Sequence, residues 1–198
     1  MSTDFSAIIL AAGNSGRMGV PKWSLMYDDK LNFAQKIAHE FSEAGANKIA
    51  LVVNTQSYEQ IEKANFKFPV NIQLIKNENP ELGRFNSLKI GVEICDPNEH
   101  VCFTNIDNPF VSAELVLKLL ENIDKADYIA PCNNGKGGHP VVISQEIVVQ
   151  IASVKQNDFN LKEFLKEFDK YLLETSCNNV LVNINTIDQY YLYFKEKV

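Results

Sequence analysis

The sequence predicts an α/β fold in which helices flank a mostly parallel, Rossmann-like sheet. Three observations carry this expectation. Strand-like and helix-like segments alternate along the chain, as they do when helices connect parallel strands. Residues 48–54 are apolar through their middle, as a strand covered on both faces should be. A glycine-rich loop directly follows the first strand-like segment. The 198 residues contain no Pro/Ser-rich linker, so we expect one domain over residues 1–198.

Each expected element has a local signal. The first strand is the apolar run at 5–12. The helix at 32–45 places Phe33, Ile37 and Phe41 on one face and ends at Gly45. The helix at 112–123 has Ser112 as its N-cap. The further expected strands are 48–54, 70–75, 100–106, 127–132, 139–144 and 179–184, and the further expected helices are 57–64, 85–94, 161–168 and 187–196.

Composition excludes several classes of protein. The net charge of −6 argues against a general nucleic-acid binder, which would present a basic face. The four cysteines are Cys95, Cys102, Cys132 and Cys177, and their wide spacing argues against a structural zinc site. We expect them to be reduced thiols. The first residues lack the basic segment of a signal peptide, and no apolar run is long enough to span a membrane. We therefore expect a cytoplasmic protein without nucleic-acid or membrane partners.

The loop within "LAAGNSGRMGVPK", residues 10–22, has the composition of an anion site. Its glycines let backbone N–H groups approach a phosphate, while Arg17 and Lys22 supply positive charge. The spacing excludes two common phosphate loops. Met18 stands where a Walker A loop requires glycine, and Ser15 occupies the second glycine position of GxGxxG. A mobile surface turn is the alternative interpretation of the composition alone.

The order of residues in this loop resembles the signature LAAGxSxRMGxxK of the MobA-like nucleotidyltransferases, a family that includes enzymes attaching CMP or GMP to the molybdenum cofactor. Later stretches resemble the same family in the same order. They are "NPELGRFNSLKIGVE" with Gly83, Ser87, Leu88 and Gly91, "TNIDNPFVS" with Asp107, "GKGGHPVVIS", and "VLVNINTIDQYYLY". The resemblance spans residues 5 to 193.

The sequence departs from the family pattern at two places. Gly137 stands where an arginine usually precedes "GHP". Asn183 and Asn185 replace two aspartates of the closing segment, and Ile187 replaces its proline. A neutral amide oxygen still coordinates Mg²⁺, but it lacks the charge of a carboxylate.

The resemblance implies a role for each matched residue. Lys22, Arg17 and Asp107 would be catalytic, and Asp107 with Asn185 would hold Mg²⁺. Gly138 and His139 would face the substrate. The implied nucleotide-binding residues are Leu10, Ala11, Ala12, Gly13, Ser15, Gly16, Arg17, Lys22, Asn79, Gly83 and Ser87. From the residues alone, Asp107 could instead open a turn, and His139 could simply shape a loop.

The implied reaction is transfer of NMP from an NTP to a phosphorylated small-molecule acceptor, with release of pyrophosphate. The nucleophile is already an anion, so the absence of a Ser/His/Asp arrangement is expected. "AAG" at 11–13 favours CTP over GTP, and molybdopterin or the molybdenum cofactor is the favoured acceptor. An acceptor protein that receives the finished cofactor is a further implied partner. Two alternatives stay open: a sugar- or alditol-phosphate nucleotidyltransferase, and a nucleotide-binding protein without turnover, which the paired asparagines suggest.

Overall fold

A computed structural model describes residues 3–16, 18–155 and 159–194. Among these residues no helix is both long and apolar enough to cross a membrane. The strands are β1 (Phe5–Ala11), β2 (Ile49–Asn54), β3 (Ile72–Asn77), β4 (His100–Asn105), β5 (Tyr128–Asn133), β6 (Lys136–Gly137), β7 (Val141–Ile143) and β8 (Lys170–Glu174). The α-helices are α1 (Phe33–Glu43), α2 (Thr55–Ala64), α3 (Gly83–Val92), α4 (Ala113–Leu120), α5 (Gln145–Ser153), α6 (Leu161–Phe164) and α7 (Ile187–Phe194).

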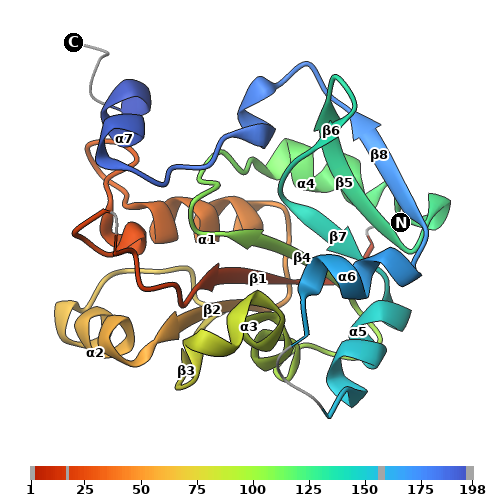
Figure 1. The fold of residues 1–198 in the computed structure, drawn as a ribbon, viewed down its shortest axis with the longest axis horizontal. Coiled ribbons are helices and arrows are strands. Elements are labelled where there is room, and N and C mark those ends of the chain that lie inside the picture. The colour runs from red at the N-terminus through yellow and green to blue at the C-terminus, as the bar shows by residue number, and fades with distance from the viewer. Residues whose placement is uncertain (1–2, 17, 156–158, 195–198) are drawn as a thin grey trace.

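The strands form one sheet in the order β3-β2-β1-β4-β7-β5-β6, and β8 also pairs with β5 (Figure 1). Strands β3, β2, β1 and β4 are parallel, and so are β5 and β8. β7 lies antiparallel between β4 and β5. The expected α/β fold with a mostly parallel sheet is therefore confirmed.

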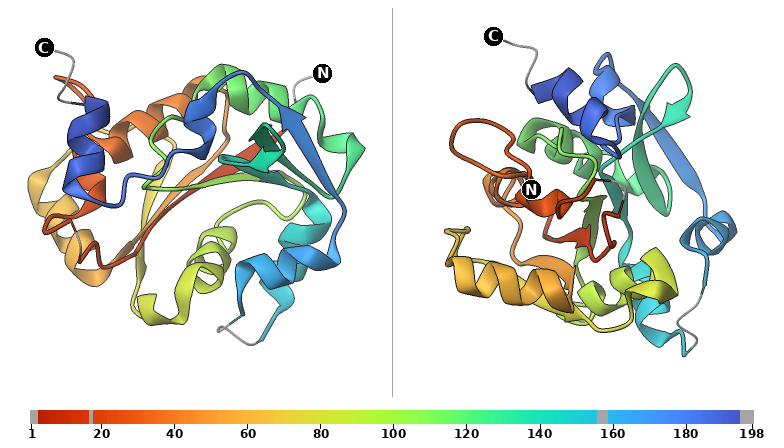
Figure 2. Two further views of the ribbon diagram at one scale, coloured as in Figure 1. Left: turned by 45° about the horizontal axis from the view of Figure 1, so that its top comes forward. Right: turned by 60° about the vertical axis from the view of Figure 1, so that its left-hand side comes forward.

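Helices cover both faces of the sheet (Figure 2). Ala7 and Ile9 of β1 face a core built with α1, α4 and α7. Ile8 and Leu10 face a second core built with α3, α5 and α6. Because side chains alternate along a strand, a central strand buried on both faces reads as a continuous apolar run, and all of β1 is buried.

Two sequence expectations need correction, and three elements of the structure were not predicted. Residues 179–184 form a 3₁₀ turn at Asn178–Leu181 followed by irregular chain, not a strand. Their backbone bonds to the loop after β4 rather than to a strand, since the amide of Ile184 donates to the carbonyl of Asp107 at 2.8 Å. The helix expected at 161–168 is α6 followed by a 3₁₀ turn at Leu165–Glu167. Helix α5 and strands β6 and β8 were not expected.

Candidate active site

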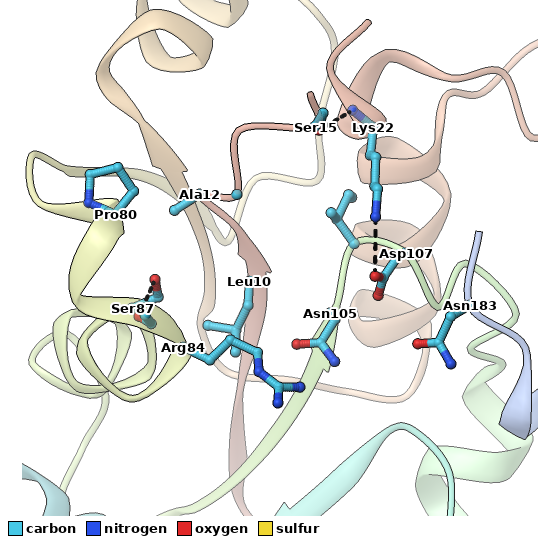
Figure 3. A pocket seen from close by; sticks show the side chains of 13 residues that line it. Leu10, Ala12, Ser15, Lys22, Pro80, Arg84, Ser87, Asn105, Asp107 and Asn183 are labelled. Carbon is cyan, nitrogen blue, oxygen red and sulfur yellow. Dashed lines mark hydrogen bonds and ion pairs between the residues drawn. The ribbon is translucent and has the colours of Figure 1, made fainter. Parts of the chain in front are cut away.

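A cavity of about 410 Å³ opens at the carboxyl edge of the sheet, where β1 and β4 end (Figure 3). This is the edge at which open α/β sheets bind ligands. The walls come from the loops after β1 and β4, the start of α3 and the segment before α7. The lining residues are Leu10, Ala12, Gly13, Ser15, Lys22, Pro80, Gly83, Arg84, Ser87, Asn105, Ile106, Asp107 and Asn183.

The ammonium group of Lys22 joins the first loop to two distant parts of the chain. Its Nζ donates to Asp107 Oδ2 at 3.2 Å and to Asn185 Oδ1 at 2.7 Å. The Lys22 and Asp107 side chains are only 14% and 20% exposed, so this ion pair is partly shielded from water. The three residues that the sequence predicts for charge stabilisation and metal binding thus meet at one point.

The loop after β1 is held in shape by its own serine. Ser15 has a φ of +47°, and its hydroxyl accepts a hydrogen bond from the Lys22 amide at 3.2 Å. Its carbonyl accepts from the Met18 amide at 2.9 Å. Lys22 then begins a 3₁₀ turn in which Trp23 is buried. These contacts fix the base of the Lys22 side chain. Arg17, predicted to bind phosphates, lies outside the described residues.

Asn108 fixes the segment before α7 against the loop that carries Asp107. Its Nδ2 donates to the carbonyl of Val182 at 2.8 Å and to Asn183 Oδ1 at 3.0 Å. The backbone N–H of Asn185 in turn donates to Gln189 Oε1 at 2.8 Å. Asn183 is thereby engaged by Asn108, whereas Asn185 turns its amide oxygen to Lys22. The two asparagines of the closing segment hold different positions.

The oxygens around Lys22 fit a divalent cation. Asp107 Oδ2 and Asn185 Oδ1 already converge on one positive charge, and Asp107 Oδ1 is buried without a hydrogen-bond partner among the described residues. Mg²⁺ is usually bound through one or two carboxylates, with waters and substrate phosphates completing its shell. No cluster of three or more His, Cys, Asp or Glu side chains suited to a metal occurs in the described part of the chain. Asp107 and Asn185 would therefore share such a cation with bound phosphates.

The opposite wall of the cavity is built on α3. The Ser87 hydroxyl accepts from Nδ2 of the fully buried Asn77 at 3.0 Å. Asn77 Oδ1 accepts from the Asn79 amide at 2.9 Å and from Asn86 Nδ2 at 3.3 Å. Gly83 has a φ of +87°, which favours glycine. Asn77 and Asn86 thus position Ser87 and the chain before α3, although sequence reasoning named neither.

His139 is neutral and lies behind the cavity. Burial, the largest influence, lowers the pKa of its imidazole to about 4, and Arg84 lowers it further, while Asp107 raises it. Its Nε2 lies 3.1 Å from Nδ2 of Asn105, and its Nδ1 is buried without a partner among the described residues. His139 therefore reaches the cavity through Asn105.

Gly138 has a packing role that the sequence did not indicate. A Cβ at this position would lie 2.2 Å from the carbonyl oxygen of Val180, which is too close for any side chain. Its amide donates to the Pro131 carbonyl at 2.7 Å. The chain needs glycine here so that it can approach the segment before α7.

The remaining predicted residues surround the cavity or lie just outside it. Leu10, Ala12, Gly13 and Lys22 line it, together with Ser15, Gly83, Ser87 and Asp107. Ala11 points into the core beside α1. Gly16 and Asn185 line a smaller adjoining pocket that also reaches Ser15 and Lys22. Asn79 contributes its backbone near α3.

Sequence reasoning missed Arg84 and Asn105, which line the cavity between α3 and β4. The scarcity of arginine was a signal for Arg84. Of the 19 Lys and Arg residues in the sequence, two are arginines, Arg17 and Arg84. Asn105 carried no comparable signal.

The chain has a relative that is similar over most of its length. The chain is 29% identical over 185 residues to molybdenum cofactor cytidylyltransferase of Escherichia coli (strain K12), covering 92% of each chain.

Three solved structures, of two proteins, have similar folds. One is Rv0371c from Mycobacterium tuberculosis H37Rv, with a TM-score of 0.78, 17% identity and 98% of each chain covered. The other is a nucleotidyl transferase from Methanothermobacter thermautotroptrophicus, with a TM-score of 0.78, 19% identity, and 98% and 97% covered. A manganese complex of Rv0371c has a TM-score of 0.76, 16% identity, and 98% and 100% covered.

The decisive comparison is with a family model. The model of the MobA-like NTP transferase domain matches residues 7–175, most of the chain. It includes the loop after β1, the start of α3 and the Asp107 loop, and so confirms the resemblance seen in the sequence. The chain belongs to the family of MobA-like NTP transferase domains.

Proposed function

We propose that this nucleotidyltransferase moves NMP from an NTP to a phosphorylated acceptor, with CTP favoured over GTP and the molybdenum cofactor as the favoured acceptor. The observation that carries the proposal is the convergence of Lys22, Asp107 and Asn185 beside a glycine-rich loop. The 29% identical cytidylyltransferase supports the choice of nucleotide and acceptor.

The reaction needs positioning and charge stabilisation more than proton transfer. A phosphate oxygen of the acceptor attacks the α-phosphorus, a new P–O bond forms, and the bond from the α-phosphorus to the bridging oxygen breaks as pyrophosphate leaves. Because the nucleophile is already anionic, no general base is needed. Neutral His139 fits such a site, since an imidazole whose pKa is lowered to about 4 is not charged near pH 7 and is not an effective acid toward a leaving group.

Different residues of the cavity would bind the phosphates, stabilise charge and contact the nucleoside. The backbone around Gly13 and Ser15 would bind the β- and γ-phosphates, with Arg17 adding charge. Lys22 would contact the α-phosphate and stabilise charge on the departing pyrophosphate. Gly83 and Ser87, on the opposite wall, would contact the nucleoside.

Magnesium is the proposed cofactor, held by Asp107 and Asn185. When bound, it would neutralise phosphate charge and orient the α-phosphate. Lys22 now contacts both oxygen donors, so we expect it to turn toward the phosphates when a metal shares those donors.

Pyrophosphate release tests the proposal. Purified protein with Mg²⁺ is offered CTP, GTP, UTP or ATP, each with molybdopterin or with sugar and alditol phosphates, and Lys22→Ala is the matched control. Release with CTP and molybdopterin is expected. Release only with a sugar phosphate would instead indicate a sugar-phosphate nucleotidyltransferase. Nucleotide binding that ignores Mg²⁺, with no release for any pair, would indicate a binding protein without turnover.

A further inference from the structure

Among the described residues that line the cavity, one cationic side chain has no ion-pair partner. Lys22, Arg84 and Asp107 are the charged lining residues, and Lys22 pairs with Asp107. Arg84, exposed on the first turn of α3, has no hydrogen bond or ion pair within the described residues. A cavity with an uncompensated guanidinium, in a protein of net charge −6, favours an anionic ligand.

Arg84 lies apart from the loop that would bind the triphosphate. Figure 3 shows its guanidinium directed across the cavity toward Asn105, whereas Ser15 and Lys22 lie toward the other end. The cavity thus presents two cationic ends. The planar guanidinium suits a phosphate, which it binds through two parallel hydrogen bonds.

Asn105 limits where a phosphate could sit, because its amide has a fixed orientation. Asn108 Nδ2 donates to the Val182 carbonyl, so Asn108 Oδ1 faces Asn105 and accepts from its Nδ2 at 3.4 Å. The same Nδ2 lies 3.1 Å from Nε2 of His139, which accepts in the neutral ring. The Asn105 Oδ1 therefore faces the cavity (Figure 3). A carbonyl oxygen repels a phosphate oxygen, so a phosphate would be held against Arg84 and away from Asn105.

We propose that Arg84 binds the phosphate of the acceptor on the side away from Lys22, in a subsite bounded by the fixed carbonyl of Asn105, so that the attacking oxygen of that phosphate faces the α-phosphate at Lys22 across the same cavity. This inference rests on the proposed function, because it divides one cavity between a nucleotide and a second phosphorylated substrate. It assigns Arg84 to the acceptor rather than to the triphosphate.

The test needs no identified acceptor. The protein is first titrated with Mg²⁺ and a CTP analogue that carries a methylene bridge between the α- and β-phosphorus. Inorganic phosphate is then titrated into the saturated complex and followed by calorimetry. We expect wild type to bind phosphate, and Arg84→Met to bind it at least about tenfold more weakly, the scale of a lost charge-assisted contact. The affinity of Arg84→Met for the analogue should stay within about twofold of wild type.

Three further variants locate the phosphate. Asn105→Asp adds a negative charge beside Arg84 without changing size, and should weaken phosphate binding as much as Arg84→Met does. Asn105→Leu adds no charge and should not weaken it. Lys63→Met is the matched control, because it removes one positive charge from the exposed face of α2. It should leave both titrations unchanged.

The outcomes separate this inference from the proposed function. If Arg84→Met weakens the analogue and leaves phosphate unaffected, Arg84 serves the nucleotide and the inference is wrong. If wild type binds the analogue but no phosphate, the inference is also wrong while nucleotide binding stands. If the analogue does not bind at all, the proposed function fails. Phosphate titrated into the free protein then still shows whether Arg84 binds it.

Discussion

Lys22 Nζ donates a 2.7 Å hydrogen bond to Asn185 Oδ1, across 163 positions of sequence. The same ammonium group lies 3.2 Å from Asp107 Oδ2. The first loop, the loop after β4 and the segment before α7 therefore meet at one lysine.

Lys22→Ala should keep the fold and lower kcat by about a hundredfold or more, since a preorganised charge aimed at a transferring phosphoryl group contributes about 3 kcal/mol. Steady-state kinetics with the productive NTP and acceptor measure the effect, and circular dichroism checks the fold. Lys63→Ala, on an exposed helix face, is the control. Unchanged kinetics would remove Lys22 from the site.

Asn185→Asp should lower the Mg²⁺ concentration that gives half-maximal activity, because a carboxylate replaces a neutral ligand of a divalent cation. Asn183→Asp is the matched control, since Asn183 accepts from Asn108 rather than from Lys22. If Asn183→Asp shifts the Mg²⁺ requirement and Asn185→Asp does not, the metal ligand has been assigned to the wrong asparagine.

Asp107→Asn should abolish metal-dependent activity, because the charged ligand of the proposed site is lost while its shape is kept. Binding of Mn²⁺ to the nucleotide-free protein, followed by electron paramagnetic resonance, gives a readout independent of turnover. Wild-type Mn²⁺ affinity in Asp107→Asn would contradict the assignment.

His139 should make folding stability depend on pH. An unfolded histidine titrates near 6.5, whereas burial lowers the pKa of His139 to about 4 in the folded protein. Between these values the unfolded state binds the extra proton, so stability is full above about pH 6.5 and falls as the pH drops toward 4. From pH 7.5 to pH 5 the loss should reach at most about 2 kcal/mol.

Urea denaturation at the two pH values measures this loss, and His139→Gln should reduce it. Part of the dependence should remain in His139→Gln, because burial also lowers the pKa of His100. An identical pH dependence in wild type and His139→Gln would show that His139 is not held neutral.

Gly138→Ala should destabilise the fold by about 1–3 kcal/mol, the usual cost of forcing a group into a packed space. The added Cβ would lie 2.2 Å from the Val180 carbonyl oxygen. Gly137→Ala is the matched control, since a Cβ there first meets the flexible end of Lys170 at 3.1 Å. Equal urea midpoints for the two variants would contradict the packing role.

The sequence was most informative where a local signal and the tertiary structure agree. β1 is buried on both faces, so its apolar run identified it, and the loop behind it carried a recognisable order of glycines and cations. Residues 179–184 misled because Val180 and Ile184 are buried like strand residues. Their burial comes from tertiary packing, of Val180 against Gly138 and of Ile184 beside the Asp107 loop, which no local pattern reports. Helix α5 was missed because its run "IVVQI" is rich in β-branched residues, although Ser144 caps it and Ile147 and Ile151 share one buried face.

The same contrast holds for the site, where residues with a sequence signal were predicted and residues oriented by tertiary contacts were not. Loop chemistry predicted Lys22, and the family pattern predicted Asp107. The fixed orientation of Asn105 depends on Asn108, Val182 and His139. Those contacts form only after β4, β7 and the late segment have folded together, so a linear pattern could not report them.

The attachment of the segment before α7 to the Asp107 loop has a consequence for biosynthesis. A nascent chain that stops short of residue 182 can form β1, β4 and the cavity wall on α3, but it lacks the carbonyl that holds Asn108 and the amide that meets Lys22. The order of translation therefore places completion of the proposed catalytic centre after synthesis of the whole sheet. An incomplete chain on the ribosome should be unable to consume nucleotide, however well its early strands have folded.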